Sequence, residues 1–294
     1  MKYAFFPGCV SKGACPELYQ SVMQVYPKLG IDLEEMTTAS CTGAGVLQEK
    51  DEKLGDMLNA RTFALAEQQG LPIMTICSTC QGVMSQANHR LITDADYLQG
   101  INEILQEEGL TYSGTTTIKH FLWILLEDVG EEALRQRITK PLTGLRAAPF
   151  YGCYIQRPTE ALGFEEHPDR GKSLERIIEI LGAEVVDFPG KTRCCGFPIL
   201  TINKINSLSM VATHTQDAKS HGADIMVTPC PLCHLNLDGM QSQAAKQEHT
   251  TIDLPILHLP QLLGLAMGMD SKSLGLNRNL ISPESALAKT NMGL

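Results

Sequence analysis

Ten cysteines, arranged as two matching sets of five, constrain this chain more than any other feature of its sequence. Cys41 and Cys77 lie 36 residues apart, as do Cys194 and Cys230, and a Cys-x-x-Cys pair begins at the second member of each couple. Two unrelated halves have no reason to share this spacing, so the pattern indicates an internal duplication. We therefore expect two similar halves, each with its own group of thiols.

The wider composition restricts the environment and the partners of such a chain. It has 33 acidic and 24 basic residues and a net charge of -9, which leaves no basic surface for nucleic acid. The longest apolar run, residues 121–126, is far shorter than the ~20 residues that span a bilayer. Pro7 interrupts the apolar start before a signal-peptide core could form. We expect a cytoplasmic protein with no nucleic-acid partner and no transmembrane segment, whose cysteines bind metal or serve redox chemistry.

Short apolar runs alternate with helical segments between the cysteines. Residues 73–76 and 225–228 are predicted strands that end directly before the two Cys-x-x-Cys pairs. A helix is predicted from Pro16, a favourable first-turn residue, to Leu29, with Gly30 as its stop. Open α/β sheets place functional groups at the carboxyl ends of their strands. The pattern thus predicts an α/β protein of two duplicated lobes, each a small sheet with helices and with cysteine loops at strand C-terminal ends.

The predicted boundaries divide the chain into three parts. We expect an N-terminal lobe over residues 1–143, a C-terminal lobe over 144–270 and a C-terminal extension over 271–294. Residues 141–149 contain two prolines and a glycine and form the expected linker. The extension has no clear periodicity, so we expect it to pack on a partner or to remain mobile.

The second half of the chain contains a complete set of five thiols. Packed thiolates repel one another and require a positively charged core, which iron or zinc can supply. Zinc is satisfied by four ligands, so the directly adjacent pair in this set favours an iron–sulfur cluster over zinc. The expected cluster ligands are Cys153, Cys194, Cys195, Cys230 and Cys233.

These residues resemble a known family. The arrangement Cys153, Cys194-Cys195-Gly196 and Cys230-x-x-Cys233, with a partial copy in the first half, is similar to the cysteine-rich CCG domain of the B-type subunit of heterodisulfide reductase. The resemblance covers the chain from Cys9 to about Gly268. It implies a non-cubane [4Fe-4S] cluster in the C-terminal lobe. It also implies an oxidoreductase subunit that makes or breaks S–S bonds of a thiol, a disulfide or carrier-bound sulfur.

The resemblance also implies partner subunits. The expected partners are a ferredoxin-like C-type subunit and a flavin-containing A-type subunit of the same complex. Since the sequence has neither a ferredoxin cysteine run nor a flavin or nicotinamide fingerprint, a partner must supply or remove electrons. Related domains also serve complexes that oxidise succinate, lactate or glycolate. The alternative function is therefore an electron-transfer adaptor of a flavin-dependent dehydrogenase complex, and a third is a zinc-stabilised scaffold.

The first half departs from the family pattern at Thr42, which stands where the second adjacent cysteine is expected. A neutral hydroxyl is a poor iron ligand beside thiolates. The remaining set can hold a second iron–sulfur cluster or a zinc ion. Cys15 is either a fifth ligand or an ordinary thiol. The departure favours the B-type subunit of a sulfur-oxidising complex. The expected ligands in this half are Cys9, Cys41, Cys77 and Cys80.

A few polar residues beside the cysteines are further candidates. Arg193 directly precedes Cys194 and can offset the charge of a cluster or bind an anionic substrate. His234 directly follows Cys233 and is the candidate proton donor to a departing thiolate. His120 and His258 occupy matching positions at predicted helix starts, and their separation of 138 rather than 153 residues predicts about 15 extra residues in the first lobe.

Overall fold

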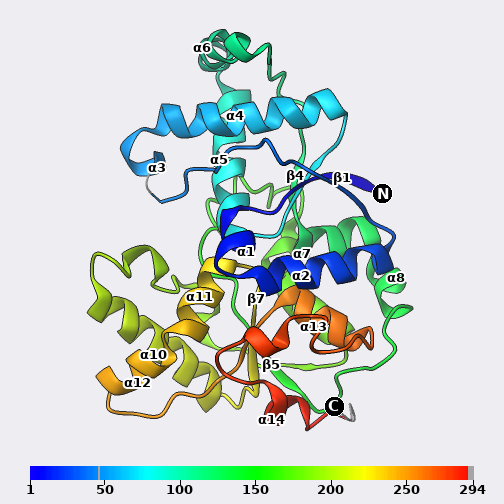
Figure 1. The fold of residues 1–294 in the computed structure, drawn as a ribbon, viewed down its shortest axis with the longest axis vertical. Coiled ribbons are helices and arrows are strands. Elements are labelled where there is room, and N and C mark those ends of the chain that lie inside the picture. The colour runs from blue at the N-terminus through cyan, green and yellow to red at the C-terminus, as the bar shows by residue number, and fades with distance from the viewer. Residues whose placement is uncertain (46, 291–294) are drawn as a thin grey trace.

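The computed structural model describes residues 1–45 and 47–290 and contains two four-stranded parallel sheets of identical strand order (Figure 1). The first sheet has the order β2-β1-β3-β4 and is formed by β1 (Lys2–Phe6), β2 (Asp32–Glu35), β3 (Ile73–Thr75) and β4 (Ile118–His120). The second has the order β6-β5-β7-β8 and is formed by β5 (Arg146–Pro149), β6 (Glu184–Val185), β7 (Ile225–Thr228) and β8 (Ile256–His258). The predicted α/β fold of two duplicated lobes is confirmed.

The strand register brings the cysteine-bearing segments to one edge of each sheet. In the first sheet Phe6 pairs with Thr75, so β1 and β3 end level with each other, just before Cys9 and Cys77. In the second sheet β5 and β7 are paired in the same parallel sense. The predicted placement of the cysteine loops beyond strand ends is therefore confirmed in both lobes.

Helices flank both sheets. Those of the first lobe are α1 (Cys9–Gly13), α2 (Pro16–Val25), α3 (Leu47–Lys50), α4 (Glu52–Gln69), α5 (Ser78–Thr93), α6 (Ala95–Leu105), α7 (Phe121–Ile124) and α8 (Glu131–Arg135). Those of the second lobe and the tail are α9 (Ser173–Ile180), α10 (Lys204–Ser220), α11 (Pro231–Gly239), α12 (Gln241–Gln247), α13 (Leu259–Ala266) and α14 (Glu284–Leu287). No helix within the described residues is long and apolar enough to cross a membrane.

The sequence predicted several helix features correctly. The segment from Pro16 continues through a 3₁₀ turn, Tyr26–Leu29, and stops at Gly30, whose φ of 71° is left-handed. The predicted extra residues of the first lobe lengthen its helices. α5 has 16 residues against 9 in α11, and α6 has 11 against 7 in α12.

The two lobes share a hydrophobic core. Leu18 of α2, Leu122 of α7, Ile177 of α9 and Leu262 of α13 belong to the same buried cluster. Helix α13 of the second lobe packs on α2 of the first, as the central part of Figure 1 shows, and α7 packs on α9. We propose 1–143 and 144–270 as the limits of the duplicated halves, which share this core.

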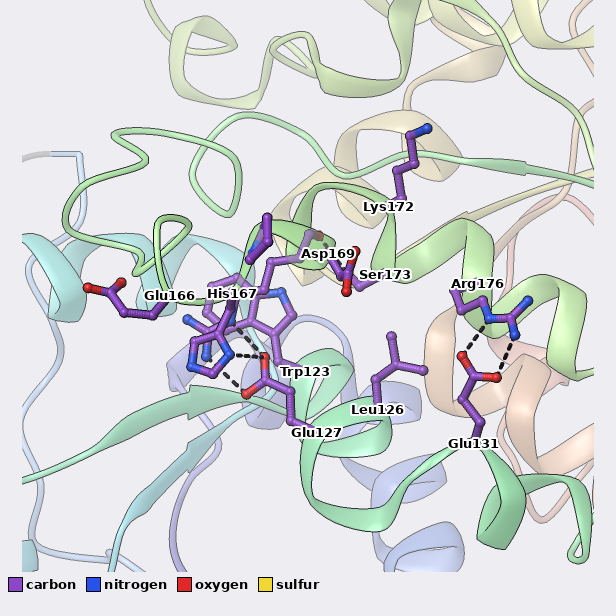
Figure 2. A pocket seen from close by; sticks show the side chains of 12 residues that line it. Trp123, Leu126, Glu127, Glu131, Glu166, His167, Asp169, Lys172, Ser173 and Arg176 are labelled. Atoms are coloured by element: carbon purple, nitrogen blue, oxygen red, sulfur yellow. Dashed lines mark hydrogen bonds and ion pairs between the residues drawn. The ribbon is translucent and has the colours of Figure 1, made fainter.

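Paired charges also join the halves (Figure 2). Glu127 of the first lobe accepts a hydrogen bond from Arg170 of the second at 2.7 Å, and Glu131 pairs with Arg176. The Arg170 guanidinium lies 4.2 Å from the centre of the Trp123 ring. These residues line a depression of about 470 Å³ that no described cysteine lines. The main charged groups of the depression are already paired across the lobes. These ion pairs are therefore better explained as contacts that stabilise the association of the lobes than as part of a ligand site.

Two sequence expectations need correction. Residues 146–149 of the expected linker form the strand β5, where the small side chains of Ala147 and Ala148 are fully buried and Pro149 ends the strand. The prediction of a linker is therefore wrong for residues 146–149. The extension was expected to contact a partner or to be mobile, but Leu274 and Leu287 are buried in the shared core. The expected mobility is wrong for residues 271–290, whereas contact of the extension with a partner stays a prediction and 291–294 lie outside the described residues.

Candidate metal centres

The second cysteine set is assembled by three loops of the C-terminal lobe. Cys153 follows β5, Cys194 and Cys195 lie between two 3₁₀ turns, and Cys230 and Cys233 begin α11. The backbone around this set is fixed by hydrogen bonds. The Cys230 N–H donates to the hydroxyl of Thr228 at the end of β7, with an N···O distance of 3.3 Å. The five predicted ligands therefore converge, although they span 81 residues of sequence, from 153 to 233.

Contacts among these thiols change their acidity in opposite directions. Hydrogen bonds from Cys153 and Cys195 lower the pKa of Cys194. The same interactions with Cys194 raise the pKa of Cys153 and of Cys195. Cys233 contacts both Cys195 and Cys230. The sulfur atoms thus form a continuous group that could be bound to one metal core.

The main chain leaves room for that group. Gly152 has a φ of 72°, and a Cβ placed on it would lie 2.8 Å from the Cys233 sulfur. On the other side, the Asn236 side-chain amide donates to the Cys195 carbonyl at 2.7 Å, and His214 Nε2 lies 2.9 Å from the Cys194 carbonyl oxygen. Asn236 and His214 carried no sequence signal, since both lie on helices outside the cysteine motifs. Five thiol donors around space that a methyl group would fill fit an iron–sulfur cluster.

An open pocket of about 580 Å³ lies against this set. All five cysteines line it, and the first lobe contributes Ser78, Thr79 and other residues. The Thr79 hydroxyl lies 3.4 Å from the Cys230 sulfur. Most of the remaining wall is apolar and includes Phe197, Pro198, Ile199, Leu200, Ile202 and Leu232. Ile202 is 84% exposed, so an apolar side chain stands in water at the rim of the pocket.

The first cysteine set has a similar cradle with a different fifth member. Cys9 contacts Cys41. Partial burial raises the pKa of Cys9, and the contact with Cys41 raises it further. Thr42 is buried in the position equivalent to Cys195, with its hydroxyl 3.8 Å from the Cys80 sulfur. Asn59 donates to the Thr42 carbonyl at 3.0 Å, as Asn236 does to the Cys195 carbonyl. The fold therefore preserves the supports of the site while replacing one thiol by a hydroxyl.

The two sets meet at the boundary between the lobes. Cys77 and Cys230 stand at the N-terminal ends of α5 and α11, and a hydrogen bond with Cys230 is the largest of the effects that raise the pKa of Cys77. The Ser78 hydroxyl donates to the Pro229 carbonyl at 3.2 Å across the same boundary. The two sets are thus adjacent at Cys77 and Cys230, which sequence spacing within each half could not show.

Comparison with known proteins identifies the family. A sequence profile described as the cysteine-rich domain, CCG, matches residues 3–85 and 147–238. The chain belongs to this CCG family. The 8-methylmenaquinol:fumarate reductase membrane anchor subunit of Wolinella succinogenes is 40% identical over 280 residues, covering 95% of this chain and 97% of that subunit.

A second relative has a different reductase name. The B-type subunit of the ferredoxin/F(420)H(2)-dependent CoB-CoM heterodisulfide reductase of Methanosarcina acetivorans is 32% identical over 293 residues, covering 98% of this chain and 96% of that subunit. A solved structure of a hypothetical protein from Helicobacter pylori has a TM-score of 0.76 and 16% identity, and covers 96% of this chain and 52% of that one. The structural likeness shows the fold alone. The relatives show a CCG protein related to the B-type subunits of heterodisulfide reductases, within a group of reductase subunits.

The remaining candidates lie outside the CCG pocket. Arg193 is exposed and lines, with Arg157, a separate depression of about 460 Å³ beside Cys153 and Cys194. His234 is buried, and its Nε2 lies 3.0 Å from the Ile256 carbonyl oxygen. His234 is not among the described residues that line the cysteine pocket.

The other two residues of interest are also displaced from the CCG ligand sets. Cys15 Sγ lies 3.6 Å from the Pro231 carbonyl oxygen, in a group with Glu17 and two histidines rather than beside Cys9. This location does not support Cys15 as a fifth ligand of the first set. His120 caps α7, because its Nδ1 accepts a hydrogen bond from the Leu122 N–H at 3.0 Å. The capping role agrees with the helix start predicted there.

Proposed function

We propose that this CCG protein is an iron–sulfur redox subunit of a multi-subunit reductase complex. In the proposal its C-terminal cysteines hold a non-cubane [4Fe-4S] cluster, which when bound supplies one-electron transfer between the pocket and the partner subunits. The proposal rests on one observation: five contacting thiols form one wall of an open, mainly apolar pocket. The proposed ligands are Cys153, Cys194, Cys195, Cys230 and Cys233.

For the first set we propose a second iron–sulfur cluster held by four cysteines, with zinc as the alternative. Four thiols suit either centre. The contact between Cys77 and Cys230 supports a relay function, because it places the two sets next to each other. The proposed ligands are Cys9, Cys41, Cys77 and Cys80. A ferredoxin-like and a flavin-containing subunit remain the proposed partners, in the cytoplasm or at its membrane face.

The pocket favours an apolar two-electron carrier, of the quinol class, as the molecule that exchanges electrons with this subunit. Phe197, Ile199 and Leu200 would exclude water from a bound ring, and the exposed Glu49 and Lys50 provide polar groups at the rim. Oxidation of a quinol to a quinone releases two electrons to the complex and two protons to water. The relative named for 8-methylmenaquinol supports this choice, since it matches almost the whole chain. The function is then that of an electron-transfer adaptor of a flavin-dependent complex.

Chemistry on sulfur is the second candidate. In this case the subunit makes or breaks the S–S bond of a thiol, disulfide or carrier-bound sulfur substrate at the C-terminal cluster. The heterodisulfide reductase relative supports it. So does the depression beside Cys153 and Cys194, where Arg157 and Arg193 could bind an anionic substrate. The buried location of His234 gives no support to its predicted role as proton donor.

Rapid-mixing spectroscopy separates the two candidates. Protein purified without oxygen and reduced with dithionite is mixed with 2,3-dimethyl-1,4-naphthoquinone or with an aliphatic disulfide. We expect the quinone to reoxidise the iron chromophore and the disulfide to leave it reduced. Ile202→Asp should slow the quinone reaction about tenfold with unchanged iron content, whereas Ile92→Asp, at an apolar residue 51% exposed outside the pocket, should not. Rapid reoxidation by the disulfide alone would favour sulfur chemistry and reject the quinone assignment.

A further inference from the structure

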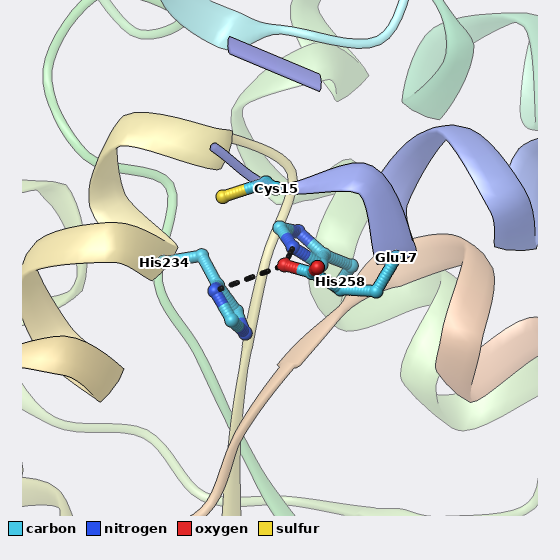
Figure 3. A group of neighbouring side chains, drawn as sticks. All are labelled: Cys15, Glu17, His234 and His258. Atoms are coloured by element: carbon cyan, nitrogen blue, oxygen red, sulfur yellow. Dashed lines mark hydrogen bonds and ion pairs between the residues drawn. The ribbon is translucent and has the colours of Figure 1, made fainter. Parts of the chain in front are cut away.

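Four metal-binding side chains converge in the interior, apart from the two cysteine sets (Figure 3). They are Cys15, Glu17, His234 and His258, and one ligand atom from each lies within 4.8 Å of the others. Glu17 Oε1 is 3.4 Å from His258 Nε2 and 4.0 Å from His234 Nδ1. All four residues are at most 5% exposed, so water does not screen the charges of this group.

The hydrogen bonds of His234 orient an acceptor into the group. Its Nε2 lies 3.0 Å from the Ile256 carbonyl oxygen, which only accepts, and 3.4 Å from the Asn279 amide nitrogen, which already donates to that carbonyl at 2.6 Å. The shorter contact favours the tautomer that is protonated at Nε2. In the neutral ring, Nδ1 then presents a lone pair toward the Glu17 carboxylate, which is also an acceptor. Two acceptors facing each other in a buried site are unfavourable unless a proton or a metal ion lies between them. A histidine whose second nitrogen donates to a carbonyl is a common support of metal ligation.

Arg278 does not occupy this position. Its Nε lies 3.3 Å from Glu17 Oε2, the other carboxylate oxygen, and its side chain is 53% exposed. The oxygen Oε1 therefore remains directed at the two histidines. The rings of His234 and His258 are stacked, with centres 3.9 Å apart, and Glu17 Oε1 lies within 4.0 Å of one nitrogen of each ring (Figure 3).

We propose that Cys15, Glu17, His234 and His258 bind one zinc ion. Thiolate, imidazole and carboxylate are the usual ligands of Zn²⁺, and four of them complete its tetrahedron. One thiolate and one carboxylate balance the two positive charges, which makes the buried site neutral. Tetrahedral zinc requires ligand atoms about 3.3–3.8 Å apart, so the side chains need to move inward only slightly.

The location of the ligands indicates what the ion does. Cys15 and Glu17 belong to the start of α2 in the first lobe, whereas His234 lies in α11 and His258 at the end of β8 in the second. A zinc ion here joins the duplicated halves covalently close to the point where their cysteine sets meet. It is a closed, structural site, since four protein ligands leave no position for substrate. It also gives a role to Cys15, the cysteine that the CCG pattern does not use.

Metal analysis and zinc X-ray absorption test the proposal on the full chain, purified without oxygen and without a histidine tag after growth with added zinc. We expect about one zinc per chain, with one sulfur ligand at about 2.3 Å and three nitrogen or oxygen ligands at about 2.0–2.2 Å. Cys15→Ala and His258→Gln should each lower bound zinc at least tenfold while iron and acid-labile sulfide stay unchanged. His120→Gln, at the matching histidine of the first lobe, is the control and should retain the zinc.

Two results would overturn the assignment. One is wild-type protein that contains less than a tenth of a zinc ion per chain. The other is zinc with four sulfur ligands, which would place the ion in the first cysteine set, a result that Cys9→Ala would verify by removing it. Both are measured on wild-type protein, so a variant that fails to fold does not decide the question. The proposed redox function is read from iron and sulfide, and its failure would be seen separately.

Discussion

Replacement of Gly152 by alanine should remove the metal cluster that we propose for the C-terminal lobe, without unfolding the protein. The new Cβ would lie 2.8 Å from the Cys233 sulfur, and ordinary contact begins near 3.4 Å, so the sulfur must retreat by about 0.6 Å. Metal–ligand distances tolerate deviations of only about 0.2 Å. The φ of 72° at this position adds a backbone cost of about 1–2 kcal/mol. The displacement therefore exceeds the tolerance of the site, whereas the strain alone is bearable for a chain of this size.

Gly30→Ala separates these two effects. Gly30 has a φ of 71°, close to that of Gly152, but no heavy atom lies within 4 Å of its Cβ position. Both variants are purified without oxygen, and iron, acid-labile sulfide and thermal unfolding are measured. We expect similar melting temperatures for the two, with iron and sulfide lowered by half or more only in Gly152→Ala. Full iron and sulfide in that variant would refute the inferred proximity of the metal core to Cys233.

Three further perturbations test other parts of the structure. Cys195→Ser should abolish the unusual cluster, and normal metal content with normal activity would contradict its assignment as a ligand. Thr42→Cys should restore a five-cysteine set in the first lobe, visible as added iron and a second copy of the paramagnetic signal, and an unchanged spectrum would count against equivalent cradles. Burial acts to raise the pKa of Glu127, but Arg170 and Lys119 outweigh it and lower that pKa overall. Glu127→Gln should therefore lower the free energy of unfolding by about 1–3 kcal/mol at neutral pH. This loss should shrink as the pH falls below 4.5, because the Glu127 carboxylate becomes protonated as the pH passes through its lowered pKa. Chemical denaturation at several pH values measures the difference, and a pH-independent difference would argue against a stabilising ion pair between the lobes.

The lobes and their cysteine loops were predictable because their signals are local. The runs before Cys77 and Cys230 are short and apolar, and each leads directly into its motif, so a strand and a following ligand could be assigned together. Because the two halves are repeats, the elements predicted for one lobe could also be assigned to the other. The same reasoning failed at β5, whose alanines and terminal proline resemble a linker until parallel pairing on both sides buries them.

Features that depend on contact between the halves could not be predicted from local signals. Glu17 and His258 are 241 residues apart. Glu17 belongs to no motif, and His258 was noticed only as the counterpart of His120 in the repeat. His234 was noticed only as a neighbour of Cys233, but helical geometry turns its ring away from the pocket and toward Glu17. The tail was misjudged for the same reason, since Leu274 is buried by packing on α13, where Gly264 leaves space for it.

The difference between Thr42 and Cys195 is the basis for proposing different centres in the two lobes. Both residues are buried, and a side-chain amide, from Asn59 or Asn236, donates to the carbonyl of each. The surroundings of Thr42 and Cys195 therefore match. The two sets differ in one side-chain atom, a hydroxyl oxygen in place of a sulfur, and in the pocket that lies beside them. Within the described residues, the apolar pocket is lined by the whole C-terminal set and by no member of the N-terminal ligand set. In the proposed function this pocket brings substrate to the centre that has the fifth thiol. Cys9 and Cys41 of the other set are exposed outside the pocket, and the contact between the sets suits that centre to carrying electrons.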